Sequence, residues 1–246
     1  MSKLIRLYEA VMAYGDGCEE DEAKALIMAG KVVVNQQRID KPGHSIRSTD
    51  QVRIKKQNRF VSRGGEKLFH ALEGFGVTGR LSEAHVLDAG ASTGGFTDCC
   101  LQMGAASVVA VDVGTNQLAW KLRKDTRVRV KEQTDIRALE SGEIGDLDFI
   151  VGDLSFIGLR QVLPAITNLC SLKTELILLV KPQFELDAVD VPEGGVVVAA
   201  EDRLRAVSGV LKQLQDLGFS LTDFADSAIA GKSGNVEVFV WARRAS

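Results

Sequence analysis

Two charged residues end apolar segments at positions where a shared site would form. Asp153 ends the run "DFIVGDL" and Lys181 ends "ILLVKP". Both runs are typical of strands in a parallel sheet, and ligands of such sheets lie outside the carboxyl ends of the strands. Glu237 begins a segment expected to run antiparallel, so it starts at that same edge. Lys67, on a helix before the sheet, could approach the group from above.

Two lysines and two carboxylates at one sheet edge suit the transfer of a methyl group to a hydroxyl. The hydroxyl must lose its proton as the methyl carbon is attacked. Lys181 would accept that proton if neutral, or steer the oxygen if charged, and the residues leave both roles open. A structural ion pair between Asp153 and Lys181 is the alternative. Taken alone, Lys67 and Glu237 are expected to be solvated surface residues, as most charged residues are.

The segment "LDAGASTGGF", residues 87–96, has the form of a cofactor-binding turn between a strand and a helix. Gly90 matches the first glycine of the dinucleotide fingerprint, but Ser92 stands where a pyrophosphate needs bare backbone. Asp88 would repel a pyrophosphate and could instead bind a cationic ammonium or sulfonium group. Ser92 and Asp88 therefore disfavour a nicotinamide cofactor. The alternative is a tight turn made by glycines alone.

Two acids follow the next two expected strands. Asp112 comes 24 residues after Asp88, a spacing that suits a ribose diol. Asp135 lies just past the third strand, where it could contact an adenine amine. We therefore predict an S-adenosylmethionine site formed by Asp88, Gly90, Gly94, Asp112 and Asp135. Ser92 lies on the loop of this site and is included among its residues.

Strand-like and helical patterns alternate from residue 85 onward. Continuous apolar strands between helices predict a mostly parallel sheet covered on both faces. The last two strands, 219–224 and 236–244, are joined by a short stretch, whereas parallel neighbours need a long crossover. The last strand is therefore expected to be antiparallel. The predicted fold class is α/β, a Rossmann-like unit with a seven-stranded sheet, its first five strands at residues 85–90, 107–113, 127–130, 148–154 and 175–182.

A compact front module precedes this body. Helices are expected at 3–15 and 19–30, and strands at 31–35 and 50–56. Residues 1–68 carry a net charge of +4, which against −3 for the whole chain leaves −7 for the rest. A basic front on an acidic body suggests a polyanion-binding module. We predict a small RNA-binding domain (1–58), a junction (59–66) and a methyltransferase domain (67–246), with RNA-contact candidates at Arg6, Lys31, Arg59 and Arg63.

Composition excludes several classes of protein. The 246 residues, 45% of them hydrophobic, contain no run near the roughly 18 apolar residues of a membrane helix. The start lacks the pattern of a signal peptide, so we expect a cytoplasmic protein without a membrane partner. Four cysteines without a CxxC pair, and three histidines, predict buried free thiols with no disulfide and no metal site. Oligomeric state is left open.

Several ordered motifs resemble the TlyA-type, or haemolysin A, family of FtsJ-like ribose methyltransferases. They are "ALIMAGKVVVN", "VSRGGEKL", "LDAGASTGGFTDCCL", "AVDVGTNQLAWKLR", "DLSFI", "LLVKPQFE" and "GNVEVF". The resemblance implies 2′-O-methylation of ribosomal RNA, in RNA or a ribosomal subunit, with S-adenosylmethionine as donor. Its catalytic tetrad falls on Lys67, Asp153, Lys181 and Glu237. It also implies that the front module is a small RNA-binding domain shared with a ribosomal protein.

Two other functions stay open on the residues. One is a non-catalytic RNA-binding factor with a relic cofactor fold, against which the intact tetrad argues. Separately, the acids at 19–22 would weaken phosphate binding by the front module. The other is a membrane-active haemolysin, which would need a secretion signal and an insertion segment. Phe156 and Phe184 lie beside the tetrad positions and could stack a flipped base, although core packing is the expectation for both.

Overall fold

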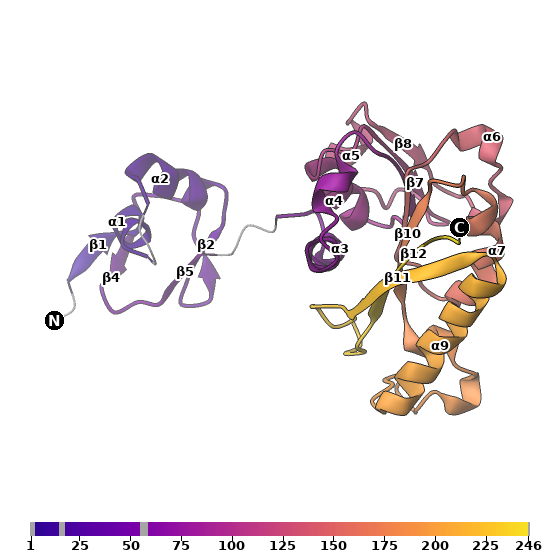
Figure 1. The fold of residues 1–246 in the computed structure, drawn as a ribbon. Helices are drawn as coiled ribbons and strands as arrows, with labels where there is room; N and C mark the ends of the chain where they lie inside the picture. The colour runs from indigo at the N-terminus through magenta and orange to yellow at the C-terminus, as the bar shows by residue number, and fades with distance from the viewer. Residues whose placement is uncertain (1–2, 15–17, 55–58, 246) are drawn as a thin grey trace. The chain divides into compact units, whose positions relative to one another are not determined.

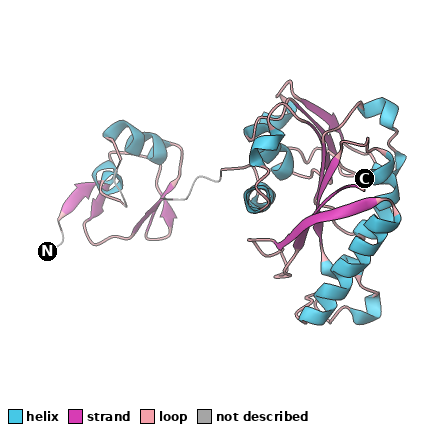
Figure 2. Cartoon of the chain, in the orientation of Figure 1, coloured by secondary structure: helices cyan, strands magenta, loops and turns pink. Residues whose placement is uncertain are grey.

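The computed structural model describes residues 3–14, 18–54 and 59–245 (Figure 1). The chain forms two compact units, residues 1–58 and 59–246. Helices and short strands build the first unit, and a large sheet flanked by helices builds the second (Figure 2).

The small unit packs two helices against short antiparallel ribbons. Its core includes Leu7, Val11 and Ile27, all with no exposed surface. The expected helix over 3–15 is wrong at its start, because Ile5 pairs across a ribbon with Ile46 before the helix begins at Leu7. The elements are β1 (Leu4–Arg6), α1 (Leu7–Met12), α2 (Glu20–Met28), β2 (Val32–Val34), β3 (Gln37–Arg38), β4 (Ser45–Arg47) and β5 (Val52–Ile54).

The large unit contains the predicted seven-stranded sheet. Its strand order is β11-β12-β10-β9-β6-β7-β8. Strand β12 runs antiparallel to both neighbours, and β6 to β10 pair in parallel, which confirms the expected topology. The strands are β6 (His85–Ala89), β7 (Ser107–Val111), β8 (Val128–Lys131), β9 (Phe149–Gly152), β10 (Glu175–Val180), β11 (Phe219–Asp226) and β12 (Val238–Arg244).

Helices cover both faces of this sheet, each over its own apolar core. Residues of α3, α4 and the segment before α5 share one core, and residues of α7 and α9 share the other (Figure 1). The helices are α3 (Arg63–Gly74), α4 (Gly95–Gln102), α5 (Trp120–Arg123), α6 (Ser141–Ile144), α7 (Leu159–Asn168), α8 (Pro182–Glu185) and α9 (Ala200–Asp216), with 3-10 turns η1 (Thr78–Leu81), η2 (Ile136–Ala138) and η3 (Ala188–Asp190). Within the described residues, no helix is both long and apolar enough to span a bilayer.

The segment expected as a junction, 59–66, is packed into the large unit. Phe60 is 2% exposed and belongs to the core under α3. The N–H of Val61 donates to the Asp98 carboxylate at 2.8 Å. Helix α3 then begins at Arg63, within the expected junction, so this stretch is fixed beside the site described next.

Candidate active site

All four predicted tetrad residues line one cleft at the carboxyl edge of the sheet. The cleft has a volume of about 480 Å³. Asp153 follows β9 and Lys181 follows β10, and these neighbouring parallel strands end side by side. Glu237 precedes the antiparallel β12, and Lys67 comes from α3. The structure therefore brings together side chains from four separate elements.

Lys67 and Glu237 form a buried ion pair. The Lys67 Nζ lies 2.5 Å from the Glu237 Oε2, and the side chains are only 8% and 4% exposed. The expectation that each is a solvated surface residue is therefore wrong. Packing of α3 over the start of β12 removes both from water, and a buried charge needs a partner because its desolvation is costly.

Lys181 and Asp153 form a second ion pair on the cleft wall. The Lys181 Nζ lies 2.6 Å from the Asp153 Oδ1 and donates to the Ser155 Oγ at 2.7 Å. The ion pair expected as an alternative to catalysis is present. The Asp153 side chain is 24% exposed, so the pair is open to the cleft rather than sealed in the core. Ser155 was not singled out in the sequence, although it lies two residues after Asp153.

The glycine loop borders the same cleft. Gly90 adopts a φ of +82°, and a Cβ there would lie 2.9 Å from the Asp153 carbonyl oxygen. Gly94 adopts a φ of +93°, and a Cβ would lie 2.3 Å from a Leu122 methyl. Both positions thus require glycine for conformation and for close approach. The loop is a tight turn that depends on its glycines, as the alternative drawn from the sequence holds. Gly90 and Ser92 also line the cleft.

Asp88 is fully buried beneath this loop. Its Oδ2 accepts hydrogen bonds from the Thr97 N–H at 2.8 Å and the Thr97 hydroxyl at 2.6 Å. Burial raises the pKa of Asp88 to about 7, against the lowering effect of the Thr97 bonds. In this structure the carboxylate therefore holds the start of α4, so direct contact with a cationic ligand stays a prediction.

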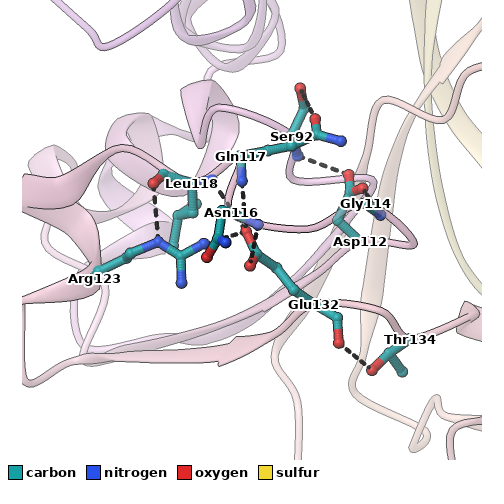
Figure 3. A network of polar contacts seen from close by, with 9 residues as sticks. All are labelled: Ser92, Asp112, Gly114, Asn116, Gln117, Leu118, Arg123, Glu132 and Thr134. Atoms are coloured by element: carbon teal, nitrogen blue, oxygen red, sulfur yellow. Dashed lines mark hydrogen bonds and ion pairs between the residues drawn. The ribbon is translucent and has the colours of Figure 1, made fainter.

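A second cleft of about 400 Å³ adjoins the first and shares Gly90, Ser92 and Asp153 with it. Asp112 and Asp135, the acids predicted for ribose and adenine, both line it. The Asp112 carboxylate accepts the Ser92 N–H at 2.8 Å and the Gly114 N–H at 2.7 Å (Figure 3). The Asp135 carboxylate pairs with Arg137, which lowers the pKa of Asp135.

Glu132, which was not predicted from the sequence, organises the loop beside this second cleft. Its carboxylate accepts the N–H groups of three successive residues, 116–118, at 2.8 to 3.1 Å (Figure 3). The Arg123 guanidinium pairs with the same carboxylate and lowers the pKa of Glu132 to about 2. Within this loop Gln117 accepts from the Ser92 hydroxyl at 3.1 Å. Its position could have indicated a role at the site, because Glu132 directly follows β8 at the carboxyl edge of the sheet.

The RNA-contact candidates lie in different surroundings. Arg63 is exposed and lines the first cleft. The Arg59 guanidinium stacks on Phe69, with its Cζ 3.7 Å from the ring centroid. In the small unit, Arg6 is exposed and donates to the Gly43 carbonyl at 2.8 Å, whereas Lys31 is half-buried.

The expectation that Phe156 packs in the core is wrong. Its side chain is 94% exposed, and its φ of +67° is rare for a bulky residue. Its ring centroid lies 6.1 Å from that of Phe184, which is half-buried. Phe156 borders both clefts, and Phe184 borders the first. A strained, exposed aromatic at a cleft indicates a functional role more than a structural one.

Comparisons with known proteins agree with this geometry. The FtsJ-like methyltransferase family matches residues 60–244, and the S4 domain family matches residues 21–52. The 16S/23S rRNA (cytidine-2′-O)-methyltransferase TlyA of Mycobacterium tuberculosis is 42% identical over 99% of this chain and 91% of that protein. Hemolysin A of Brachyspira hyodysenteriae is 36% identical over 95% of this chain and 97% of its own length.

Solved structures share the fold. A Streptococcus thermophilus protein that bears the name hemolysin aligns with a TM-score of 0.74 and 37% identity, over 100% of this chain and 90% of that chain. A magnesium protoporphyrin IX methyltransferase from Synechocystis, at 16% identity and a TM-score of 0.51, covers 75% of this chain and 85% of its own and shares the fold alone. The chain therefore belongs to the FtsJ-like methyltransferase family, is related to TlyA and hemolysin A over nearly its whole length, and carries an S4 domain before its methyltransferase domain.

Proposed function

We propose that this protein transfers a methyl group from S-adenosylmethionine to a ribose 2′-hydroxyl of ribosomal RNA. The observation that carries the proposal is the pair of adjoining clefts. The tetrad side chains, which suit proton handling, line one, and Asp112 and Asp135, which suit a nucleoside, line the other. The names of the TlyA relatives support ribosomal RNA as the substrate. Such a substrate places the enzyme in the cytoplasm.

The second cleft fits the methyl donor. Each Asp112 oxygen accepts one backbone N–H and keeps a second lone pair for a ribose hydroxyl. Asp135 would accept the adenine amine, and the bare backbone at Gly90 allows the donor to lie close to Asp153. When bound, the donor supplies an electrophilic methyl carbon on a sulfonium. Its position between these residues would direct that carbon toward the first cleft.

The tetrad would prepare the ribose hydroxyl in the first cleft. Lys181 is held by Asp153 and Ser155, so its Nζ is fixed at the wall where the hydroxyl would lie. There it would orient the oxygen as an ammonium and, in its neutral form, receive the hydroxyl proton. The buried pair of Lys67 and Glu237 would form the opposite side and exclude water from the reacting atoms.

Surrounding residues would position the RNA. The exposed ring of Phe156, with Phe184 behind it, would stack the base of the flipped target nucleotide. Arg59 and Arg63 would contact the phosphate backbone near the first cleft. The small unit, with Arg6 and Lys31, would also bind RNA, although the exposed acids at the start of α2 would weaken this contact.

Calorimetric titration of the purified protein with S-adenosylmethionine and, separately, with NADH tests the donor site. We expect binding of the first alone, weakened in an Asp112→Ala variant. Binding of NADH alone would contradict the proposal. If neither binds and the native protein also fails to methylate ribosomal subunits, the proposal fails, and RNA binding by the native protein would then support a non-catalytic RNA-binding factor.

A further inference from the structure

An exposed tryptophan lies outside the site residues described above. Trp120, the first residue of α5, is 68% exposed. In the described part of the large unit its ring packs against no other aromatic ring, and the Lys124 Nζ lies 4.9 Å from its centroid. Burying a tryptophan strongly favours folding, so an open one suggests a role in binding.

Backbone contacts fix α5 to the wall of the first cleft. The N–H of Ala119, the residue before Trp120, donates to the Thr93 carbonyl at 3.1 Å. Thr93 lines the first cleft, and Leu118 and Leu122 close over Gly94 next to it. Trp120 is therefore held on a short segment attached to the glycine loop, on the same side of the sheet as α3 and α4 (Figure 1).

Two lysines belong to the same short segment as the indole, Lys124 over its ring and Lys121 next to it in sequence. Lys121 is 56% exposed although it pairs with Asp98 at 2.9 Å. The same Asp98 accepts the Val61 N–H, which ties α5 to the segment that leads into the exposed Arg63. An exposed aromatic ring with a lysine over it and a second exposed lysine next to it in sequence matches single-stranded nucleic acid, whose bases stack while its phosphates meet the cations. A protein partner would require a wider apolar patch than one indole.

We propose that Trp120, with Lys121 and Lys124, is a contact surface for a single-stranded nucleotide that flanks the methylated one in the RNA. The base stacks on the indole, and the two lysines contact the adjoining phosphates. This inference rests on the proposed function, because it takes RNA as the substrate of the first cleft.

The test compares Trp120→Ala, Trp120→Phe and a control, Leu172→Ala, in methyl transfer from labelled S-adenosylmethionine to purified bacterial ribosomal subunits. Leu172 is 88% exposed and lies just before β10, at the opposite edge of the sheet. For Trp120→Ala we expect the KM for subunits to rise about tenfold, since one stacked base contributes on that order. The kcat and the calorimetric Kd of the donor should stay the same. Trp120→Phe should recover most of the loss, and Leu172→Ala should match the native protein.

An unchanged KM in Trp120→Ala, with robust methyl transfer, would overturn the contact surface and leave the proposed function standing. A KM that rises for subunits but not for protein-free ribosomal RNA would also overturn it, because the partner would be a ribosomal protein.

If the native protein methylates no RNA, the proposed function fails, and fluorescence tests the surface by itself. The chain has two tryptophans, and the other, Trp241, is 8% exposed. The difference between native and Trp120→Phe spectra reports Trp120 while a synthetic single strand of about 12 nucleotides is added. Quenching of this difference supports the surface, and an unchanged difference refutes it.

Discussion

The two adjoining clefts are built by different means. The first depends on side chains paired across distant parts of the sequence, such as Lys67 and Glu237, which are 170 positions apart. The second depends on carboxylates that bind nearby backbone N–H groups, as Asp112 does with Gly114 two residues later. The first is therefore set by how helices pack on the sheet, and the second by the conformation of the loops. Substitutions in the two clefts should have different consequences.

The largest effect is expected for Lys181→Ala in the first cleft. Loss of the group proposed to orient and deprotonate the hydroxyl should lower the rate of methyl transfer by about 10² to 10⁴. Donor binding, which we propose for the second cleft, should be retained. The measurement is labelled-methyl transfer to ribosomal subunits beside calorimetric titration of the donor. The control variant is Lys212→Met, which replaces an exposed lysine of α9. If Lys181→Ala transferred methyl groups at the native rate, the proposal that the first cleft carries out the transfer would be contradicted.

Glu237→Leu should destabilise the fold as well as reduce activity. It leaves the Lys67 ammonium buried without a countercharge, and breaking a buried pair in this way costs about 3 kcal/mol or more. Urea unfolding measures the change. The double variant Lys67→Met/Glu237→Leu should regain most of the stability and remain inactive. If the single and double variants unfold alike, the two side chains are not coupled.

Glu132→Gln should act on the second cleft alone. The uncharged amide holds the N–H groups of residues 116–118 and the Arg123 guanidinium less firmly, so the loop loosens. We expect donor affinity to fall about tenfold, or about 1.4 kcal/mol, with little change in kcat at saturating donor. Calorimetry measures the affinity, with the exposed Glu201→Gln on α9 as its control. A fall in kcat alone would place Glu132 with the first cleft.

A further effect, on stability alone, is a pH dependence that originates in Asp88. Its pKa is about 7 in the folded protein and 3.8 ordinarily, so the folded state binds more protons between these values. Stability should therefore fall as pH rises from about 4 to about 7 and then level off. Asn at this position keeps an acceptor for Thr97 and cannot ionise. Urea unfolding at steps across this range should show a shallower decline for Asp88→Asn. Equal slopes in both proteins would contradict the assignment.

The sheet and its ligand-bearing edge could be predicted because buried parallel strands give uninterrupted apolar runs. Asp153 and Lys181 end such runs, so strand adjacency alone predicts that they meet. The antiparallel β12 followed from the short connection before it. The short β1 was missed because the pairing of Ile5 with Ile46 is a tertiary contact that local helical periodicity cannot reveal.

Burial of single residues was less predictable. Whether Lys67 is solvated depends on where α3 packs, and the residues around it are compatible with an exposed lysine. Phe156 fails in the opposite direction, because aromatic side chains are usually at least partly buried, whereas this one is 94% exposed at a residue with a positive φ. Asp88 was chosen for charge and position, and its hydrogen bonds to Thr97 depend on how α4 starts.

The position of the transferred methyl group tests the central proposal most directly. Ribosomal subunits are incubated with the protein and labelled S-adenosylmethionine, and the purified RNA is then hydrolysed in alkali. Alkaline cleavage requires a free 2′-hydroxyl, so a 2′-O-methyl group protects the adjoining bond. We predict that the label is recovered in alkali-resistant dinucleotides with the native protein and is absent with Lys181→Ala. Label in mononucleotides would mean base methylation and would contradict the proposed role of the tetrad, as would equal labelling by Lys181→Ala.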